Sequence, residues 1–293
     1  MDANATPFQT RITHFRPPSE ACQLPFALGS ATQHRPSAVI ECHNSQDAVS
    51  LIVAKHHMVA AITDGCSSTH PQLEASCHSS NEVGSKLLAY LVSSAALRIA
   101  ASHPKMSEEA FLKKLNDKVR KALNILLRTF CGNDRTRREM FTFDFLMTTV
   151  IGFIVSNDRF LVFHSGDGLV AVNGEIQNLE SDAGQYIAND FIPSPQGKAR
   201  RHLRTCSLKP CSSGSTSDLQ SIFAATDGLS RLATNHTTEL REFVTTMPCP
   251  NQVEKGFDFL LQEFRQKIAW NSELRLTLDD DATFALLRRF RTE

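Results

Sequence analysis

The stretch Val59-Ala60-Ala61-Ile62-Thr63-Asp64-Gly65 is a short apolar run that ends in an aspartate followed at once by a glycine. The pattern recurs twice, where residues 161–166 lead into Asp167-Gly168 and residues 222–226 lead into Asp227-Gly228. A continuous apolar run of this length is typical of a strand covered on both faces, and glycine marks the sharp turn after it. Each strand is therefore predicted to deliver a carboxylate to the rim of a sheet.

A fourth acidic site, Asp279-Asp280-Asp281, lies far downstream and just before the apolar run at residues 282–287. It is therefore predicted at the start of a strand. Carboxylates gathered at one sheet edge repel one another unless cations lie among them. Oxygen ligands without a clustered His and Cys set favour Mg²⁺ or Mn²⁺ over Zn²⁺. A single Asp-Gly pair is more typical of an ordinary turn, and the near-repeat of the pattern is what favours a metal site.

Six short motifs, in order along the chain, resemble those of the metal-dependent protein serine/threonine phosphatases of type 2C. They are Asn44-Ser45-Gln46-Asp47-Ala48, Ile62-Thr63-Asp64-Gly65, Met147-Thr148-Thr149-Val150, His164-Ser165-Gly166-Asp167-Gly168, Ala225-Thr226-Asp227-Gly228-Leu229-Ser230 and Asp280-Asp281-Ala282-Thr283. The resemblance covers roughly residues 26–290. It implies an α+β fold, a four-layer α-β-β-α sandwich of two antiparallel sheets flanked by helices, with the metals at one end.

The resemblance also implies roles for single residues. Asp64 would bridge two Mg²⁺ or Mn²⁺ ions, and the Gly65 carbonyl would bind one of them. Asp227 and Asp280 would complete the other, and Asp47 would act mostly through bound water. The implied reaction is hydrolysis of phosphoserine or phosphothreonine esters by direct attack of a metal-bridging water, without a nucleophilic side chain. Asp47, Asp64, Asp227 and Asp280 are thus the predicted catalytic set.

Three other residues in or near these motifs have weaker assignments. Asp144 lies close to where some family members hold a third ion, and the alternative is an ordinary loop aspartate between two phenylalanines. Asp167 is interpreted as structural, fixing the turn after its strand by hydrogen bonds. His164 lies on an apolar strand, where a satisfied core histidine is more common than a metal ligand.

Two departures from the family pattern leave the function open. The family often places an arginine, which holds the substrate phosphate, five residues before the first Asp; here Cys42 occupies that position. Arg35 or an arginine of a later loop would have to replace it. The residue after Asp64-Gly65, often histidine, is Cys66. The hypotheses are an active phosphatase, favoured by the intact metal positions, a pseudophosphatase that binds a phosphoprotein, and a hydrolase of small phosphoesters.

Charge and composition predict the partners. The chain has 293 residues, 41% of them hydrophobic, with 31 basic and 31 acidic residues. A zero formal charge gives no global field that favours nucleic acid or an acidic membrane. No apolar run approaches the roughly 20 residues of a membrane helix, and the eight scattered cysteines are typical of reduced thiols. We expect a cytoplasmic monomer that acts on a phosphorylated protein, without nucleic acid or membrane partners.

Local patterns predict the elements and the organisation of the chain. Residues 1–25 are expected to be an irregular arm, and residues 26–293 the phosphatase-like domain. Strands are predicted at residues 26–32, 47–54, 57–63, 147–155, 159–164 and 168–172, and the last from residue 282. Helices are predicted from Asn81 as a cap, from Ser107, and across residues 253–268. Residues 191–219, with Lys198, Arg200, Arg201, Arg204 and Lys209, are expected to be a solvated loop or a flap beside the active site.

Overall fold

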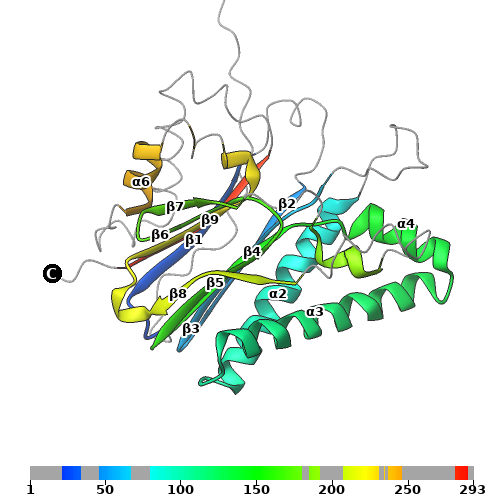
Figure 1. Ribbon diagram of the computed structural model, residues 1–293, viewed down its shortest axis with the longest axis horizontal. Helices are drawn as coiled ribbons and strands as arrows, with labels where there is room; N and C mark the ends of the chain where they lie inside the picture. The colour runs from blue at the N-terminus through cyan, green and yellow to red at the C-terminus, as the bar shows by residue number, and fades with distance from the viewer. Residues whose placement is uncertain are drawn as a thin grey trace, which may run out of the picture.

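The computed structural model describes residues 22–33, 46–66, 80–179, 185–191, 207–230, 234, 237–245 and 281–289. Two five-stranded antiparallel sheets form its centre (Figure 1). Sheet A has the order β1-β10-β9-β6-β7, with β1 Phe26–Gln33, β10 Ala282–Arg289, β9 Ser221–Ala225, β6 Leu169–Val172 and β7 Glu175–Asn178. Sheet B has the order β2-β3-β4-β5-β8, with β2 Asp47–Ala54, β3 His57–Asp64, β4 Val150–Ser156, β5 Arg159–Ser165 and β8 Lys209–Ser215.

Helices cover the outer faces of the two sheets (Figure 1). Helices α2, Asn81–Ser102, and α3, Glu108–Cys131, lie on the side of sheet B, and α4, Arg135–Phe145, follows them. Helix α6, Thr237–Thr245, lies on the side of sheet A. Three short 3-10 helices complete the described elements: η1 Ile187–Phe191, η2 Thr216–Asp218 and η3 Asp227–Leu229. The predicted four-layer α-β-β-α sandwich is confirmed.

The alternation of side chains along β3 explains why residues 58–62 are all apolar. Met58, Ala60 and Ile62 belong to the core between the two sheets. Val59 and Ala61 belong to the core between sheet B and the helices. Because successive residues of a strand point to opposite faces, a strand in the middle of a layered sandwich must be apolar at every position. The apolar runs of the sequence therefore mark the inner strands of this fold.

Several sequence predictions need correction. The end of the expected loop at residues 191–219 is strand β8, which pairs with β5 and forms an edge of sheet B. Its Ser- and Gly-rich sequence has no apolar alternation, so the backbone pairing with β5 defines it. Helix α4 also lacks an apolar period; Asp134 caps it by accepting from the Arg137 amide at 3.0 Å. Strand β7 and helix α6 were not predicted either.

Some predictions concern residues outside the described ranges. These are the irregular arm up to residue 21, Arg35 and Cys42, the basic cluster of Lys198, Arg200, Arg201 and Arg204, the helix at residues 253–268, and Asp280. The four cysteines in the described ranges, Cys22, Cys66, Cys131 and Cys211, are free thiols, as expected.

Helix α2 departs from the expectation that no segment has the length and composition of a membrane span. Its 22 residues meet that test, although half of its most apolar window is buried inside the protein. The helix packs on β2 and β3, and Ser93 Oγ lies 2.7 Å from Ser50 Oγ of β2. A core helix of a globular domain has the same composition, so this remains weak evidence for a bilayer.

Candidate active site

Strand ends from both sheets bring acidic side chains together at one end of the sandwich. In sheet B, Asp47 opens β2 and lies opposite Asp64, which closes β3, in the antiparallel register. In sheet A, Asp227 follows β9 and Asp281 precedes β10. The Thr226 hydroxyl donates to Asp47 Oδ2 at 2.8 Å and so joins the end of β9 to the start of β2.

The acidic side chains at this end interact electrostatically. Asp47 is only 4% exposed, and burial raises the pKa of its carboxyl well above the usual value. The neighbouring charges of Asp64 and Asp281 raise this pKa further, and the hydrogen bond from Thr226 lowers it. Crowded carboxylates of this kind are stabilised by a bound cation, which reverses the local repulsion. The donor chemistry fits a hard divalent ion such as Mg²⁺ or Mn²⁺.

The carboxylate oxygens are suitable ligands for such an ion, but the described residues do not form a complete set of metal ligands. Within the described ranges, no group of three or more His, Cys, Asp or Glu side chains is placed to hold a metal ion. Asp227 is exposed, and the predicted ligand Asp280 is outside those ranges. Asp281, buried beside Asp47, is the neighbour of Asp280 that sequence analysis did not single out.

The turn after β3 is fixed on both sides. The Asp64 carbonyl accepts from the Thr149 amide at 2.8 Å, and the Cys66 carbonyl accepts from Asn81 Nδ2 at 2.6 Å. A Cβ atom at Gly65 would lie 2.8 Å from the backbone oxygen of Asn81, which leaves no room for any side chain. Glycine therefore lets the start of α2 approach the turn and hold Asp64 at the rim of the sheet.

Asn81 ties three segments together and does not cap α2 as predicted. Ser80 occupies the N-cap position, without a side-chain capping bond. The Asn81 amide donates to the Phe143 carbonyl at 3.2 Å, and its Oδ1 accepts from the Met147 amide at 3.2 Å. The Asp144 carbonyl accepts from the Ser80 amide at 2.8 Å. Asp144 itself lies in the last turn of α4, so the alternative of an ordinary loop aspartate is wrong.

The turn after β9 is built in the same way. The Thr226 amide donates to the Thr283 carbonyl, and the Thr283 amide donates to Thr226 Oγ1, each at 2.9 Å. Asp227 then begins η3. A Cβ atom at Gly228 would collide with the backbone oxygen of Asp281. The glycine of this Asp-Gly pair thus permits the close approach of the β9 turn and the start of β10.

The third Asp-Gly turn does not depend on its aspartate. Asp167 is exposed and its side chain makes no hydrogen bond with any described residue, so its predicted role in fixing the turn is wrong. Gly166 and Gly168 have φ of 96° and 128°, which glycine adopts without strain. His164 Nδ1 donates to the Gly166 carbonyl at 3.0 Å, and burial lowers the pKa of this half-buried ring. His164 is therefore structural, as predicted.

Tyr186 is a residue at this end that sequence analysis missed. Its phenol lies beside the Cys66 thiol, directly after the Asp64-Gly65 turn, and the two groups influence each other's pKa. Burial raises the pKa of Cys66 to about 11, and the pKa of Tyr186 is also well above its ordinary value. Both groups therefore keep their protons at neutral pH. No sequence signal marks Tyr186, because it precedes the short helix η1 in a segment without apolar periodicity.

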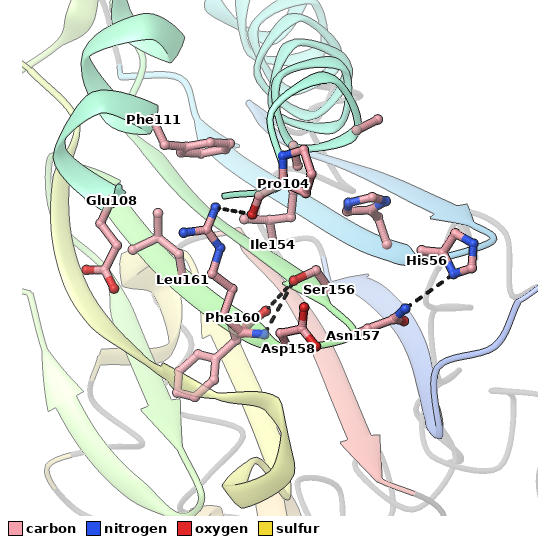
Figure 2. Close-up of a pocket in the computed structure, with 14 residues that line it drawn as sticks. His56, Pro104, Glu108, Phe111, Ile154, Ser156, Asn157, Asp158, Phe160 and Leu161 are labelled. Atoms are coloured by element: carbon pink, nitrogen blue, oxygen red, sulfur yellow. Dashed lines mark hydrogen bonds between the residues drawn. The ribbon is translucent and has the colours of Figure 1, made fainter. Parts of the chain in front are cut away.

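A cavity of about 330 Å³ lies at the opposite end of sheet B, by the β2–β3 and β4–β5 turns (Figure 2). Apolar side chains such as Phe111 and Leu161 line it together with polar groups. The Arg159 guanidinium donates to the carbonyls of Pro104 and Met106, so it holds the loop between α2 and α3. Arg159 thus has a structural role, and the strand-end carboxylates lie at the other end of the sandwich. We therefore do not assign catalysis to this cavity.

Comparisons with known proteins agree with the fold. A family model described as protein phosphatase 2C matches residues 37–267. The serine/threonine phosphatase Stp1 from Staphylococcus aureus is 15% identical, with 92% of this chain and 96% of that chain covered and a TM-score of 0.52. A bacterial serine phosphatase is also 15% identical, with 92% and 100% covered and a TM-score of 0.51. No curated protein sequence gives a significant match.

Proposed function

Because the chain belongs to the protein phosphatase 2C family and is by class a protein serine/threonine phosphatase, we propose that it hydrolyses phosphoserine and phosphothreonine esters with bound Mg²⁺ or Mn²⁺. The observation that carries the proposal is the crowding of Asp47, Asp64 and Asp281 where the two sheets meet. Bound divalent ions would supply an activated water and neutralise the charge of the phosphoryl oxygens. A soluble cytoplasmic monomer acting on phosphoproteins remains part of this proposal.

The proposed ligands are Asp64, the Gly65 carbonyl, Asp227 and Asp280, with Asp144 as a candidate for a third ion. Asp64 stands on a buried central strand, so its position is set by the strand pairing and needs little reorganisation on binding. Asp47 is proposed to accept hydrogen bonds from water in the site, with one of its oxygens already held by Thr226.

The state of Cys66 argues against a covalent mechanism through this residue. Cys66 follows the Asp64-Gly65 turn and is the described cysteine beside the proposed metal ligands. The nucleophilic form of cysteine is the thiolate, whereas burial raises the pKa of Cys66 to about 11. At neutral pH the residue is therefore a thiol, and direct attack of water on phosphorus is the better account.

A second candidate function is binding of a phosphoprotein without turnover. Cys42 in place of the phosphate-holding arginine favours it. This alternative keeps the fold and the metal ligands but lacks one electrostatic contact to the transferred group.

The decisive experiment measures turnover of a phosphoserine and phosphothreonine peptide panel in Mn²⁺, in Mg²⁺ and in chelator. We expect turnover only with metal, its loss in Asp64→Ala, and its retention in Asp167→Asn. Protein that binds metal but turns over no phosphoester would identify the second candidate. Wild-type turnover in Asp64→Ala would place the site elsewhere.

A further inference from the structure

We infer that the Tyr186 hydroxyl donates a hydrogen bond to the phosphate of the bound substrate, and that α3 holds Tyr186 in position for this contact. The inference rests on the proposed function and names a group that touches the substrate. It also concerns the missing arginine at position 42, because a hydroxyl is a neutral donor that a phosphoryl oxygen accepts well.

The location of the phenol supports a contact in the site. Tyr186 lies against Cys66, the residue that follows the proposed ligands Asp64 and Gly65. Its neighbour Gln185 is bonded to Ser165 at the end of β5, opposite the start of β4 next to the Asp64 turn, so the segment lies at the acidic rim of sheet B. The charges of Asp64 and Asp167 raise the pKa of the phenol, in agreement with this place. The thiol beside the phenol is a weak acceptor. A hydrogen bond from the hydroxyl to a phosphoryl oxygen would therefore be favourable, because hydrogen bonds to charged acceptors are the stronger ones.

The chain on the N-terminal side of the phenol is tied to sheet B. The Gln185 carbonyl accepts from Ser165 Oγ at 3.4 Å, at the end of β5. The Gln185 side chain accepts from Lys209 Nζ of β8 at 3.0 Å. The Tyr186 carbonyl accepts from the Asn189 amide at 3.0 Å, which closes the turn into η1. The backbone of Tyr186 is thus held by two strands and by its own turn.

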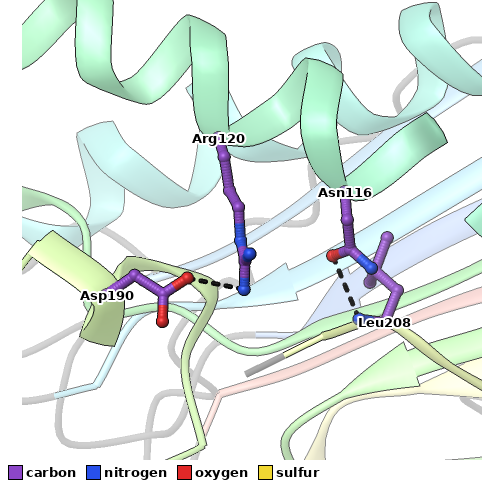
Figure 3. A network of polar contacts seen from close by, with 4 residues as sticks. All are labelled: Asn116, Arg120, Asp190 and Leu208. Carbon is purple, nitrogen blue, oxygen red and sulfur yellow. Dashed lines mark hydrogen bonds and ion pairs between the residues drawn. The ribbon is translucent and has the colours of Figure 1, made fainter. Parts of the chain in front are cut away.

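On the C-terminal side, α3 fixes the same segment (Figure 3). Arg120 Nη2 lies 2.5 Å from Asp190 Oδ2, and both side chains are largely buried, at 27% and 20% exposed. One turn earlier on α3, Asn116 Oδ1 accepts from the Leu208 amide at 3.1 Å. Figure 3 shows Arg120 and Asn116 extending from α3 toward Asp190 and Leu208. Arg120 is therefore a positioning residue for Tyr186, while Tyr186 itself would touch the substrate.

The chain offers a matched control for the phenol. It contains two tyrosines, and the other one, Tyr90, is 58% exposed on α2. Tyr186→Phe removes only the hydroxyl and keeps the ring, and Tyr90→Phe makes the same change away from the site. In Mg²⁺ we expect Tyr186→Phe to lower kcat/KM for a phosphopeptide by about 10- to 100-fold, the range for a hydrogen bond to a charged group. Tyr90→Phe should match the wild type.

A binding measurement distinguishes a direct contact between Tyr186 and phosphate from a purely structural role of Tyr186. With 3-fluorotyrosine incorporated, the protein gives two ¹⁹F resonances, which Tyr90→Phe assigns. Inorganic phosphate added with Mg²⁺ should shift the Tyr186 resonance and leave that of Tyr90 in place. Arg120→Ala should weaken phosphate binding with less effect than Tyr186→Phe, and Arg120→Lys should restore part of it, because the pair with Asp190 is retained.

The outcomes distinguish the inference from the proposed function. Wild-type protein without metal-dependent turnover overturns both. Two results overturn the inference alone when the wild type is active. One is a wild-type kcat/KM in Tyr186→Phe, and the other is a Tyr186 resonance that does not shift when phosphate is added. If Cys66→Ala lowers kcat/KM as much as Tyr186→Phe, the pair acts on the turn and not on the phosphate, which also overturns it.

Discussion

The hydroxyl of Thr226, at the end of β9 in sheet A, donates to the carboxylate of Asp47, the first residue of β2 in sheet B, at 2.8 Å. Because Thr226 also accepts from the Thr283 amide, one side chain joins three strand ends at the acidic rim. This hydroxyl therefore links the two sheets at the proposed metal site.

Thr226→Val should lower the free energy of unfolding by about 1–3 kcal/mol, because a buried carboxyl loses its donor and a buried amide loses its acceptor. Thr226→Ser keeps the hydroxyl and should stay close to the wild type. Chemical denaturation of the three proteins checks this. Equal stability of the Val and Ser variants would show that the bond contributes nothing.

Asn81→Ala should destabilise the protein by about 2–4 kcal/mol, because the side chain is fully buried and serves the Cys66 carbonyl, the Phe143 carbonyl and the Met147 amide. Activity should fall as well, since the turn that carries Asp64 loses its support. Asn157→Ala is a suitable control, because its side chain is exposed and makes one long contact to His56. The account is wrong here if both variants unfold at the same denaturant concentration.

Gly65→Ala should reduce both stability and metal affinity, because the added methyl group meets the backbone of Asn81. Gly132→Ala is the comparison: its φ of 61° disfavours alanine, but nothing lies within 4 Å of the added group. We expect a loss of about 1 kcal/mol at Gly132, from the backbone alone, and a larger one at Gly65. Thermal unfolding of both variants tests the order, and the reverse order would contradict the close packing at Gly65.

Asp167→Asn should change the free energy of unfolding by less than about 0.5 kcal/mol, because the exposed side chain has no hydrogen bond in the described ranges. Gly168→Ala should be clearly worse, since its added Cβ would lie 2.6 Å from the Ala225 oxygen at a φ of 128°. Denaturation curves decide between them. A large effect of Asp167→Asn would restore the structural role first predicted for it.

The sequence predicted the parts of the fold that carry a local signal. The inner parts of strands β3 and β9, residues 58–62 and 222–225, are apolar at each position because both faces are covered, and the Asp-Gly pairs mark the turns at their ends. Helix α3 was predictable from Ser107, which caps it, and from its inner residues Phe111 and Leu115. The motif order likewise predicted the layered sandwich.

The remaining elements depend on contacts between distant segments, which no local pattern reports. Strand β8 exists because β5 offers a free edge, and α4 because Asp134 caps a charged segment. Asparagine is a preferred N-cap residue, but the Asn81 side chain instead bonds to two carbonyls and one amide of distant segments. The segment that carries Tyr186 is anchored by Gln185 and Asp190 to β8 and α3, which are distant in the sequence. The ligand roles of Asp64, Asp227 and Asp280 stay predictions.

Calorimetric titration of Mn²⁺ into the purified protein tests the central claim most directly, because the claim concerns ligands before it concerns turnover. Asp64→Asn removes one charge at nearly constant shape, and Asp167→Asn makes the same change just after β5, two strands away from β3 in sheet B. We predict that Mn²⁺ binds the wild type and Asp167→Asn alike, and that Asp64→Asn loses at least about tenfold in affinity, as expected when a ligand charge is removed. Equal Mn²⁺ affinity of all three proteins, or no binding to the wild type, would contradict the claim.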